Sequence, residues 1–289
     1  MSLLRKKMLR DLSIRRFAST TKDSYLRAVS QLAKYYMIPP DQLTEEQLLD
    51  YINFLITDRK LSCGSVNVAA AGLRFFYKET LGRNEMALAI PPRKNPKKLP
   101  EIFNHDELKL LFASTENQKH RVMLMTAYAG GLRISEVIRL RIKDIDSGRM
   151  LIRIENSKGE KDRYTILSQR LLVELRSYWK KYRPKDFLFP SPIKDGPLSR
   201  ATPGLMFRAT KLKANIAKKV TFHSLRHTFA TNLLESGVDI RTIQILLGHS
   251  SITSTTIYLH VARKDINAVK SPLDLIDMSH VDRLKRSKS

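Results

Sequence analysis

Three short segments of this chain combine residue types that could act together on a phosphate ester. The first is Gly130–Glu136, with the sequence GGLRISE, and the second is His223–His227, with the sequence HSLRH. The third is Leu247–His249, which is followed nine residues later by Tyr258. A lysine-containing stretch, Ser157–Gly159, lies between the first two. This set of side chains suits nucleophilic attack by a tyrosine on a phosphodiester.

The needs of a tyrosine nucleophile explain the other residue types. A phenol has a pKa near 10, so about one molecule in 10³ is ionised at neutral pH, and histidine is the natural base because it titrates near neutrality. Two guanidinium groups can bind the non-bridging phosphate oxygens in a bidentate manner. A lysine can protonate the departing 5′ oxygen. Arg133, Arg226, Lys158, a histidine and Tyr258 form a complete set.

Each of these residues also has a structural interpretation. Tyr258 is one of 10 tyrosines, and core packing is the default role of such a residue. His223 and His227 have the i, i+4 spacing of a helical zinc site, but Arg226 between them would repel a cation, so we predict no metal. His227 is assigned to packing or to the support of another residue. The pair Gly130–Gly131 lacks the spacing of a P-loop, which disfavours nucleotide hydrolysis.

Helices and one β-hairpin are expected to position these residues. Asn104 precedes an apolar-periodic run and predicts a capped helix to about Ser114. Met150–Ile154 and Arg163–Leu167 are short and β-branched, and the polar stretch between them predicts a hairpin. The other helices expected after residue 100 span about 119–129, 135–140, 168–182, 202–217, 224–236, 239–246 and 251–259.

The first part of the chain is predicted to be a separate helical domain. Helical spacing of apolar residues runs over 22–36, 45–57 and 65–79, and Thr44–Gln47 has the pattern of a capping box. Ile90–Pro100 contains four prolines and four basic residues, which predict an extended linker. We therefore expect a helical domain over residues 1–90, a basic linker over 91–100 and a second domain over 101–289.

Charge and composition indicate the kind of partner. Lys and Arg total 52 against 28 acidic residues, a net charge of +24, with 18 basic and 9 acidic residues in 1–100 and 34 and 19 in the rest. Both parts are thus expected to contact a polyanion, although a ribosomal or membrane-surface partner would also explain charge alone. No apolar run approaches the roughly 20 residues that cross a bilayer. With one cysteine, Cys63, we expect a cytoplasmic protein without an intrachain disulfide.

The ordered series GLRISE, SKG, HSLRH, LGHSS and TTIYLH resembles the catalytic domain of the tyrosine site-specific recombinases, also called the phage integrase family. The likeness covers about Leu99 to Tyr258 and beyond. The helical first domain is similar in layout to the SAM-like core-binding domain of the family. The resemblance implies a mainly α fold, in which a mixed α/β catalytic domain with a small antiparallel sheet joins the helical domain to form a C-shaped clamp on DNA.

The resemblance also implies a role for each matching residue. Tyr258 would form a 3′-phosphotyrosyl link and free a 5′ hydroxyl, Arg133 and Arg226 would hold the scissile phosphate, and Lys158 would be the general acid. The covalent link keeps the energy of the broken bond, so no cofactor, metal or ATP is expected.

Three further positions complete the family's pattern. His223 would assist proton transfer to and from Tyr258, and His249 would donate a hydrogen bond to the phosphate. Glu136 occupies the acidic position, where it would orient the neighbouring catalytic groups. This sequence departs from the pattern at none of the seven positions.

The family's assembly implies the partners. They would be double-stranded DNA core sites bound by a homotetramer that spans two sites and passes through a Holliday junction, with accessory proteins in some systems. Asp265–Ile276 predicts an amphipathic helix that would dock on a neighbouring protomer or, alternatively, on its own domain. The length of the chain favours a simple two-domain recombinase, Xer-like or of the transposon or integron type.

Two other functions remain open at this point. A topoisomerase-like enzyme would nick and reseal one strand as a monomer, and a DNA-binding regulator would keep the fold without catalysis. The DNA sequence recognised and the outcome of exchange do not follow from the chain.

Overall fold

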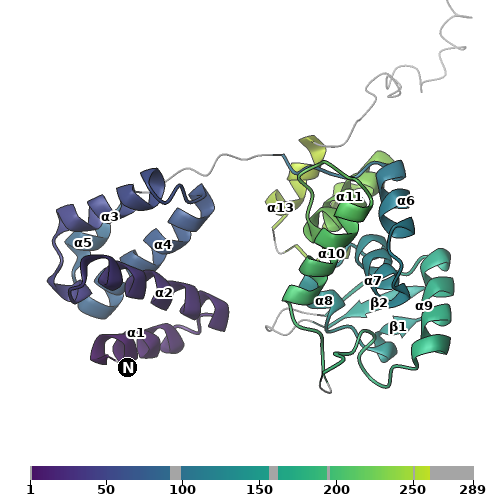
Figure 1. The fold of residues 1–289 in the computed structure, drawn as a ribbon, viewed down its shortest axis with the longest axis horizontal. Helices are drawn as coiled ribbons and strands as arrows, with labels where there is room; N and C mark the ends of the chain where they lie inside the picture. The colour runs from purple at the N-terminus through teal and green to yellow at the C-terminus, as the bar shows by residue number, and fades with distance from the viewer. Residues whose placement is uncertain (1, 92–98, 156–161, 194–195, 250, 261–289) are drawn as a thin grey trace, which may run out of the picture. The chain divides into compact units, whose positions relative to one another are not determined.

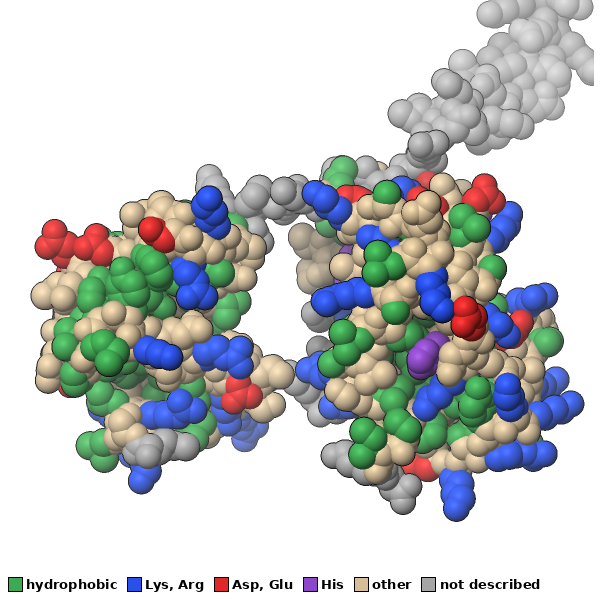
Figure 2. Space-filling view, viewed as in Figure 1, with side chains coloured by type: hydrophobic (Ala, Val, Ile, Leu, Met, Phe, Trp, Pro, Cys, Tyr) green, Lys and Arg blue, Asp and Glu red, His purple; other side chains and the backbone are tan. Residues whose placement is uncertain are grey.

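The chain forms two compact units in the computed structural model, residues 1–97 and 98–289 (Figure 1). The structure describes residues 2–91, 99–155, 162–193, 196–249 and 251–260. Each unit has its own apolar core, and Lys and Arg side chains are spread over the visible face of both (Figure 2).

The N-terminal unit consists of helices packed around one core. Its elements are α1 (Leu3–Ile14), α2 (Ser19–Tyr36), the 3₁₀ turn η1 (Pro40–Gln42), α3 (Glu45–Thr57), α4 (Cys63–Phe75), the π-helical turn η2 (Phe76–Leu81) and α5 (Asn84–Ala89). The Thr44 and Gln47 side chains form the predicted capping box at the start of α3. Helices α2 and α4 approach closely at Gly72, where a Cβ atom would lie 3.0 Å from the backbone of Tyr25.

Two helices of this unit were not predicted from the sequence. Helix α1 is rich in basic residues and buries only Met8, Asp11 and Leu12, so its apolar periodicity is weak. Helix α5 is six residues long, too short to give a periodic signal.

The C-terminal unit is built around helix α7 (Gln118–Ala129), in which five of the 12 residues are buried and none is exposed. It packs against α6 (His105–Ala113), α8 (Ile134–Val137), α9 (Gln169–Tyr182), α10 (Ala201–Lys213) and α11 (Phe222–Glu235). Helix α8 is shorter than predicted because the chain leaves it to pair Leu140 with Leu188 and Arg141 with Phe187. After α11 come α12 (Ile240–Leu247), α13 (Thr253–Thr256) and the 3₁₀ turn η4 (Ile257–His260).

A small antiparallel sheet completes the C-terminal unit. The strands β1 (Ile145–Asp146), β2 (Leu151–Ile154) and β3 (Arg163–Ile166) pair in the order β1-β2-β3. The predicted hairpin is β2–β3, with Ile154 opposite Arg163, whereas two-residue β1 was not predicted. Arg163 and Thr165 point to the buried side of β3. The predicted fold class, mainly α with this small sheet, is confirmed.

The turn that ends α7 depends on Gly131. Its φ of +61° is left-handed, and a Cβ atom there would lie 2.4 Å from the ring of Phe229 in α11. Only glycine therefore allows the chain to turn tightly against α11 and lead directly to Arg133.

Gly131→Ala should lower the free energy of unfolding. Displacing a packed ring costs roughly 1–3 kcal/mol, and the left-handed backbone adds about 1–2 kcal/mol. Gly204→Ala in α10 is the matched control, because nothing lies within 4 Å of its Cβ position and alanine favours a helix by about 1 kcal/mol. Urea denaturation of both variants and the wild type measures the free energies of unfolding to be compared. Equal stability of the two would contradict the account.

Candidate active site

A buried carboxylate, Glu136, lies at the centre of the predicted catalytic residues. Arg133 donates to it twice, from its backbone N–H to Oε2 and from Nη1 to Oε1, each at 2.8 Å. Arg163 donates from both terminal nitrogens, Nη1 to Oε1 and Nη2 to Oε2, each at 2.9 Å. Arg226 Nη1 is 3.6 Å from Oε2. Burial acts to raise the pKa of Glu136, but the bonds and charges of its arginine neighbours lower it to about 2.

Arg226 is held between two turns of the backbone. Its Nη1 donates to the carbonyl of Gly131 at 2.8 Å, and its Nη2 donates to the carbonyl of Leu247 at 2.6 Å. Burial and the charge of Arg133 lower its pKa to about 9, so it stays protonated at neutral pH. Only 1% of Arg226 is exposed, whereas 37% of the Arg133 side chain is exposed.

Helix α11 presents two histidines one turn apart. His223 and His227 contact edge to face, with ring centroids 4.6 Å apart. Burial, then the charges of Arg226 and Arg133, lower the pKa of His223. Burial, His223 and Arg226 lower the pKa of His227 to about 4. Both imidazoles are therefore neutral at physiological pH and able to accept a proton.

His249 follows the turn at the end of α12. Its Nδ1 lies 2.9 Å from Thr255 Oγ1, and its carbonyl accepts a bond from the Gln244 side chain at 2.9 Å. Burial and the charges of Arg226 and Arg133 lower its pKa to about 4. A neutral imidazole with one nitrogen fixed by Thr255 has its other nitrogen available for a ligand.

Tyr258 lies in η4, against helix α11. Its hydroxyl oxygen is 3.2 Å from Nδ1 of His227, and only 1% of the residue is exposed. Burial raises its pKa, while the charges of Arg226 and Arg133 act in the opposite direction. The phenol is thus neutral, and an imidazole nitrogen lies within hydrogen-bonding distance of its oxygen.

The structure brings together six of the seven predicted residues. These are Arg133, Glu136, His223, Arg226, His249 and Tyr258. The seventh, Lys158, lies outside the described residues. Three guanidinium groups (Arg133, Arg163 and Arg226) surround one carboxylate, and the histidines are neutral, so the site has a positive excess that suits a phosphodiester anion.

Two residues of the site were not recognised from the sequence. His227 was assigned to packing or support, yet it is the histidine within reach of the Tyr258 hydroxyl. Arg163 was treated only as the start of a strand, although the alternation of the hairpin points it inward. An inward arginine needs a buried anion as its partner, and this requirement could have linked it to Glu136.

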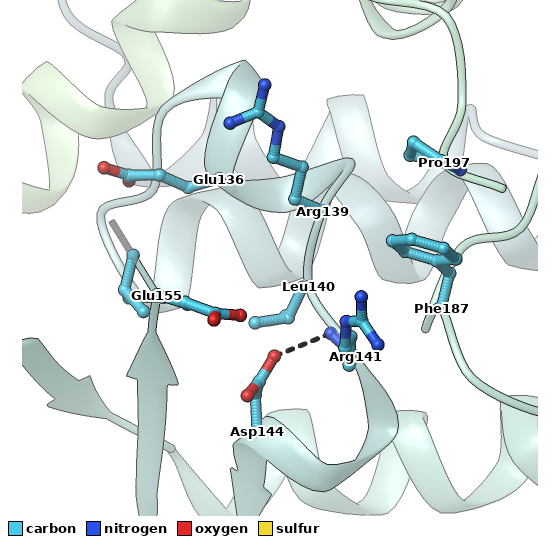
Figure 3. A pocket seen from close by; sticks show the side chains of 9 residues that line it. Glu136, Arg139, Leu140, Arg141, Asp144, Glu155, Phe187 and Pro197 are labelled. Carbon is cyan, nitrogen blue, oxygen red and sulfur yellow. Dashed lines mark hydrogen bonds between the residues drawn. The ribbon is translucent and has the colours of Figure 1, made fainter. Parts of the chain in front are cut away.

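A cavity of about 370 Å³ adjoins the site on another side of Glu136 (Figure 3). Its wall includes Arg139, Arg141, Glu155 and Phe187, and among the described residues Glu136 is the only predicted catalytic residue that lines it. It is therefore separate from the surface where the arginines and histidines meet.

Neither a metal cluster nor a membrane helix occurs in the described part of the chain. No group of three or more His, Cys, Asp or Glu side chains there could hold a metal ion. No helix among the described residues is long and apolar enough to span a bilayer.

Comparison with known proteins assigns the chain to a family. Residues 101–265 match the model of the phage integrase family. The chain belongs to the phage integrase family. Residues 4–85 also match the N-terminal SAM-like domain of phage integrases, so the resemblance predicted from the motifs is confirmed.

Several relatives are similar over most of their length. A putative integrase/recombinase, y4qK, of Sinorhizobium fredii is 43% identical over 96% of this chain and 90% of its own length. Tyrosine recombinase XerA of Pyrococcus horikoshii is 32% identical over 79% of this chain and 81% of its own. A lambda integrase tetramer bound to a Holliday junction shares the fold, with a TM-score of 0.71 and 19% identity over 86% of this chain and 77% of that one.

Glu136→Gln should destabilise the protein in a pH-dependent manner. A carboxyl whose pKa falls from 4.5 to about 2 on folding contributes roughly 3 kcal/mol. This contribution is fully present above pH 4.5 and is lost as the pH falls toward 2. The difference in unfolding free energy between wild type and Glu136→Gln, measured in urea, should therefore narrow below pH 4.5. A difference that is unchanged from pH 7 to pH 3 would show that the carboxylate charge is not the cause.

Proposed function

We propose that this chain is a site-specific DNA recombinase that cleaves and rejoins DNA through a 3′-phosphotyrosine at Tyr258. The observation that carries the proposal is the Tyr258 hydroxyl, 3.2 Å from the neutral His227, in a unit where three arginines share one carboxylate. A base beside the nucleophile and cations for the phosphate are what this reaction needs. Membership of the phage integrase family supports it independently.

In the proposed cleavage step, the Tyr258 oxygen attacks the scissile phosphorus and the bond to the 5′ oxygen breaks. The phenol proton passes to a histidine. His227 accepts it in the geometry described, and His223, in edge-to-face contact with His227, would assist once DNA is bound. Lys158 would protonate the leaving 5′ oxygen; no contact of that lysine is described.

The phosphate would be held by Arg133, Arg226 and His249. Arg133 is partly exposed and can meet a phosphate directly, whereas Arg226 and Tyr258 are each 1% exposed. We infer that DNA binding must move the end of α12 and the segment after it to uncover both of these residues. The Arg226–Leu247 hydrogen bond would be among the contacts that change.

The proposed partner is double-stranded DNA, contacted by both units. Positive charge in both parts of the chain and the SAM-like domain match support this. A homotetramer on two sites, passing through a Holliday junction, is proposed from the fold shared with the lambda integrase tetramer. The predicted helix Asp265–Ile276 lies outside the described residues, so its docking on a neighbour stays a hypothesis.

The two alternatives predict different behaviour. A monomeric nicking-resealing enzyme would relax supercoils but not exchange strands between two DNA sites. A non-catalytic regulator would form no covalent adduct at all, and its behaviour would not depend on the Tyr258 hydroxyl.

Tyr258→Phe should abolish covalent attachment to DNA and leave DNA binding largely intact, because only the nucleophilic oxygen is lost. Wild type and variant are expressed in cells and purified under denaturing conditions, and any DNA still attached is sequenced. The matched control is Tyr164→Phe, a half-exposed tyrosine on β3. We expect adducts in wild type and control, with a shared sequence that reveals the recombination site. If Tyr258→Phe gave the same yield of adducts as the wild type, Tyr258 would not be the nucleophile.

A further inference from the structure

We propose that Arg163 is a positioning residue that fixes the phosphate-binding side chains of this site, although it does not touch DNA itself. The inference rests on the proposed recombinase function and adds a residue that the family motifs in this sequence did not single out. Its basis is the set of contacts that Arg163 makes from strand β3.

Arg163 directs all of its guanidinium nitrogens toward the protein. Two of them bind the Glu136 carboxylate, each at 2.9 Å, and Nε donates to the carbonyl of Leu246 at 3.0 Å. The side chain is only 7% exposed. A side chain so enclosed and so fully bonded cannot also bind a phosphate on duplex DNA, so its influence on the reaction must pass through other residues.

One route of influence runs through Glu136 to Arg133. The two carboxylate oxygens that accept from Arg163 also accept from Arg133, at 2.8 Å. Without the guanidinium fork the carboxylate could tilt or rotate, and the partly exposed Arg133 side chain would lose its fixed direction. A displaced carboxylate would also affect Arg226, whose Nη1 lies 3.6 Å from Glu136 Oε2.

The other route runs through the turn that precedes His249. Arg163 holds the Leu246 carbonyl, and Gly248 packs directly on its side chain, since a Cβ atom there would lie 2.6 Å from Arg163 Cδ. Gly248 has a φ of +64°, so the chain turns tightly at this contact. Arg163 thus links the Arg133 side of the site to the His249 side.

Only an arginine can make this set of bonds. Its planar fork matches both carboxylate oxygens while Nε remains free for a third acceptor, whereas lysine is a point charge on a flexible stem. Lysine would keep the charge beside Glu136 but lose the geometry. Arg163→Lys therefore tests whether Arg163 positions the Glu136 carboxylate or only neutralises its charge.

The test compares Arg163→Lys with Arg149→Lys, a matched change at an exposed arginine between β1 and β2. Single-turnover cleavage is measured on a duplex carrying the site recovered from the covalent adducts. One substrate has the natural scissile phosphate and the other a methylphosphonate, which lacks the negative charge. The DNA affinity and the circular dichroism spectrum of each variant are measured and compared with those of the wild type.

We expect Arg163→Lys to cleave the natural phosphate about 10–100-fold more slowly, the loss seen when residues that orient the ligands of a metal ion are replaced. DNA affinity should be unchanged, because Arg163 makes no contact with the duplex. The defect should shrink on the methylphosphonate, because a neutral centre depends less on aligned guanidinium groups. Arg149→Lys should cleave both substrates like wild type.

Arg163→Gln supplies a second variant if Arg163→Lys folds poorly. It keeps a hydrogen-bond donor at this position but loses the guanidinium fork, and it should give the same substrate-dependent defect. Normal cleavage by Arg163→Lys, or an equal defect on both substrates, would overturn the positioning role. If the wild type forms no covalent complex, the proposed recombinase function fails instead, so the two failures are distinguishable.

Discussion

The site depends on one buried carboxylate shared by arginines from three different elements. Glu136 accepts hydrogen bonds from Arg133 at the start of α8 and from Arg163 on β3, and it lies 3.6 Å from Arg226 on α11. Buried cations are costly unless they are paired. One anion among three guanidinium groups fixes their positions and still leaves a positive excess. That excess suits the negatively charged phosphodiester of the proposed reaction, so the geometry of the site and its charge have one physical origin.

Much of the fold follows from local patterns in the sequence. The Thr44 capping box starts α3 where it was expected, and Asn104 caps α6 in the same manner. What the patterns miss are elements defined by tertiary contact. Strand β1 is two residues long, and α8 ends early because Leu140 pairs with Leu188. Such pairings join residues far apart in the chain, so no local periodicity encodes them.

The site could be predicted as a set of residue types, but not as a network. The motifs predicted Tyr258 as the nucleophile and Arg133 and Arg226 as phosphate ligands without the structure. They assigned proton transfer to His223 and packing or support to His227, whereas His227 is the one within reach of the tyrosine, because both lie on one helix and only the packing of η4 decides which imidazole lies beside it. Arg163 belongs to no motif, and its role emerges only where β3, α8 and α12 meet.

The most direct measurement of the central claim is the identity of the residue that carries DNA. Wild-type protein is trapped on DNA, the covalent complex is digested with nuclease and protease, and the modified peptide is sequenced by mass spectrometry. The account predicts a nucleotide joined through its 3′ phosphate to Tyr258. A 5′ linkage, or attachment to any other residue, would contradict it.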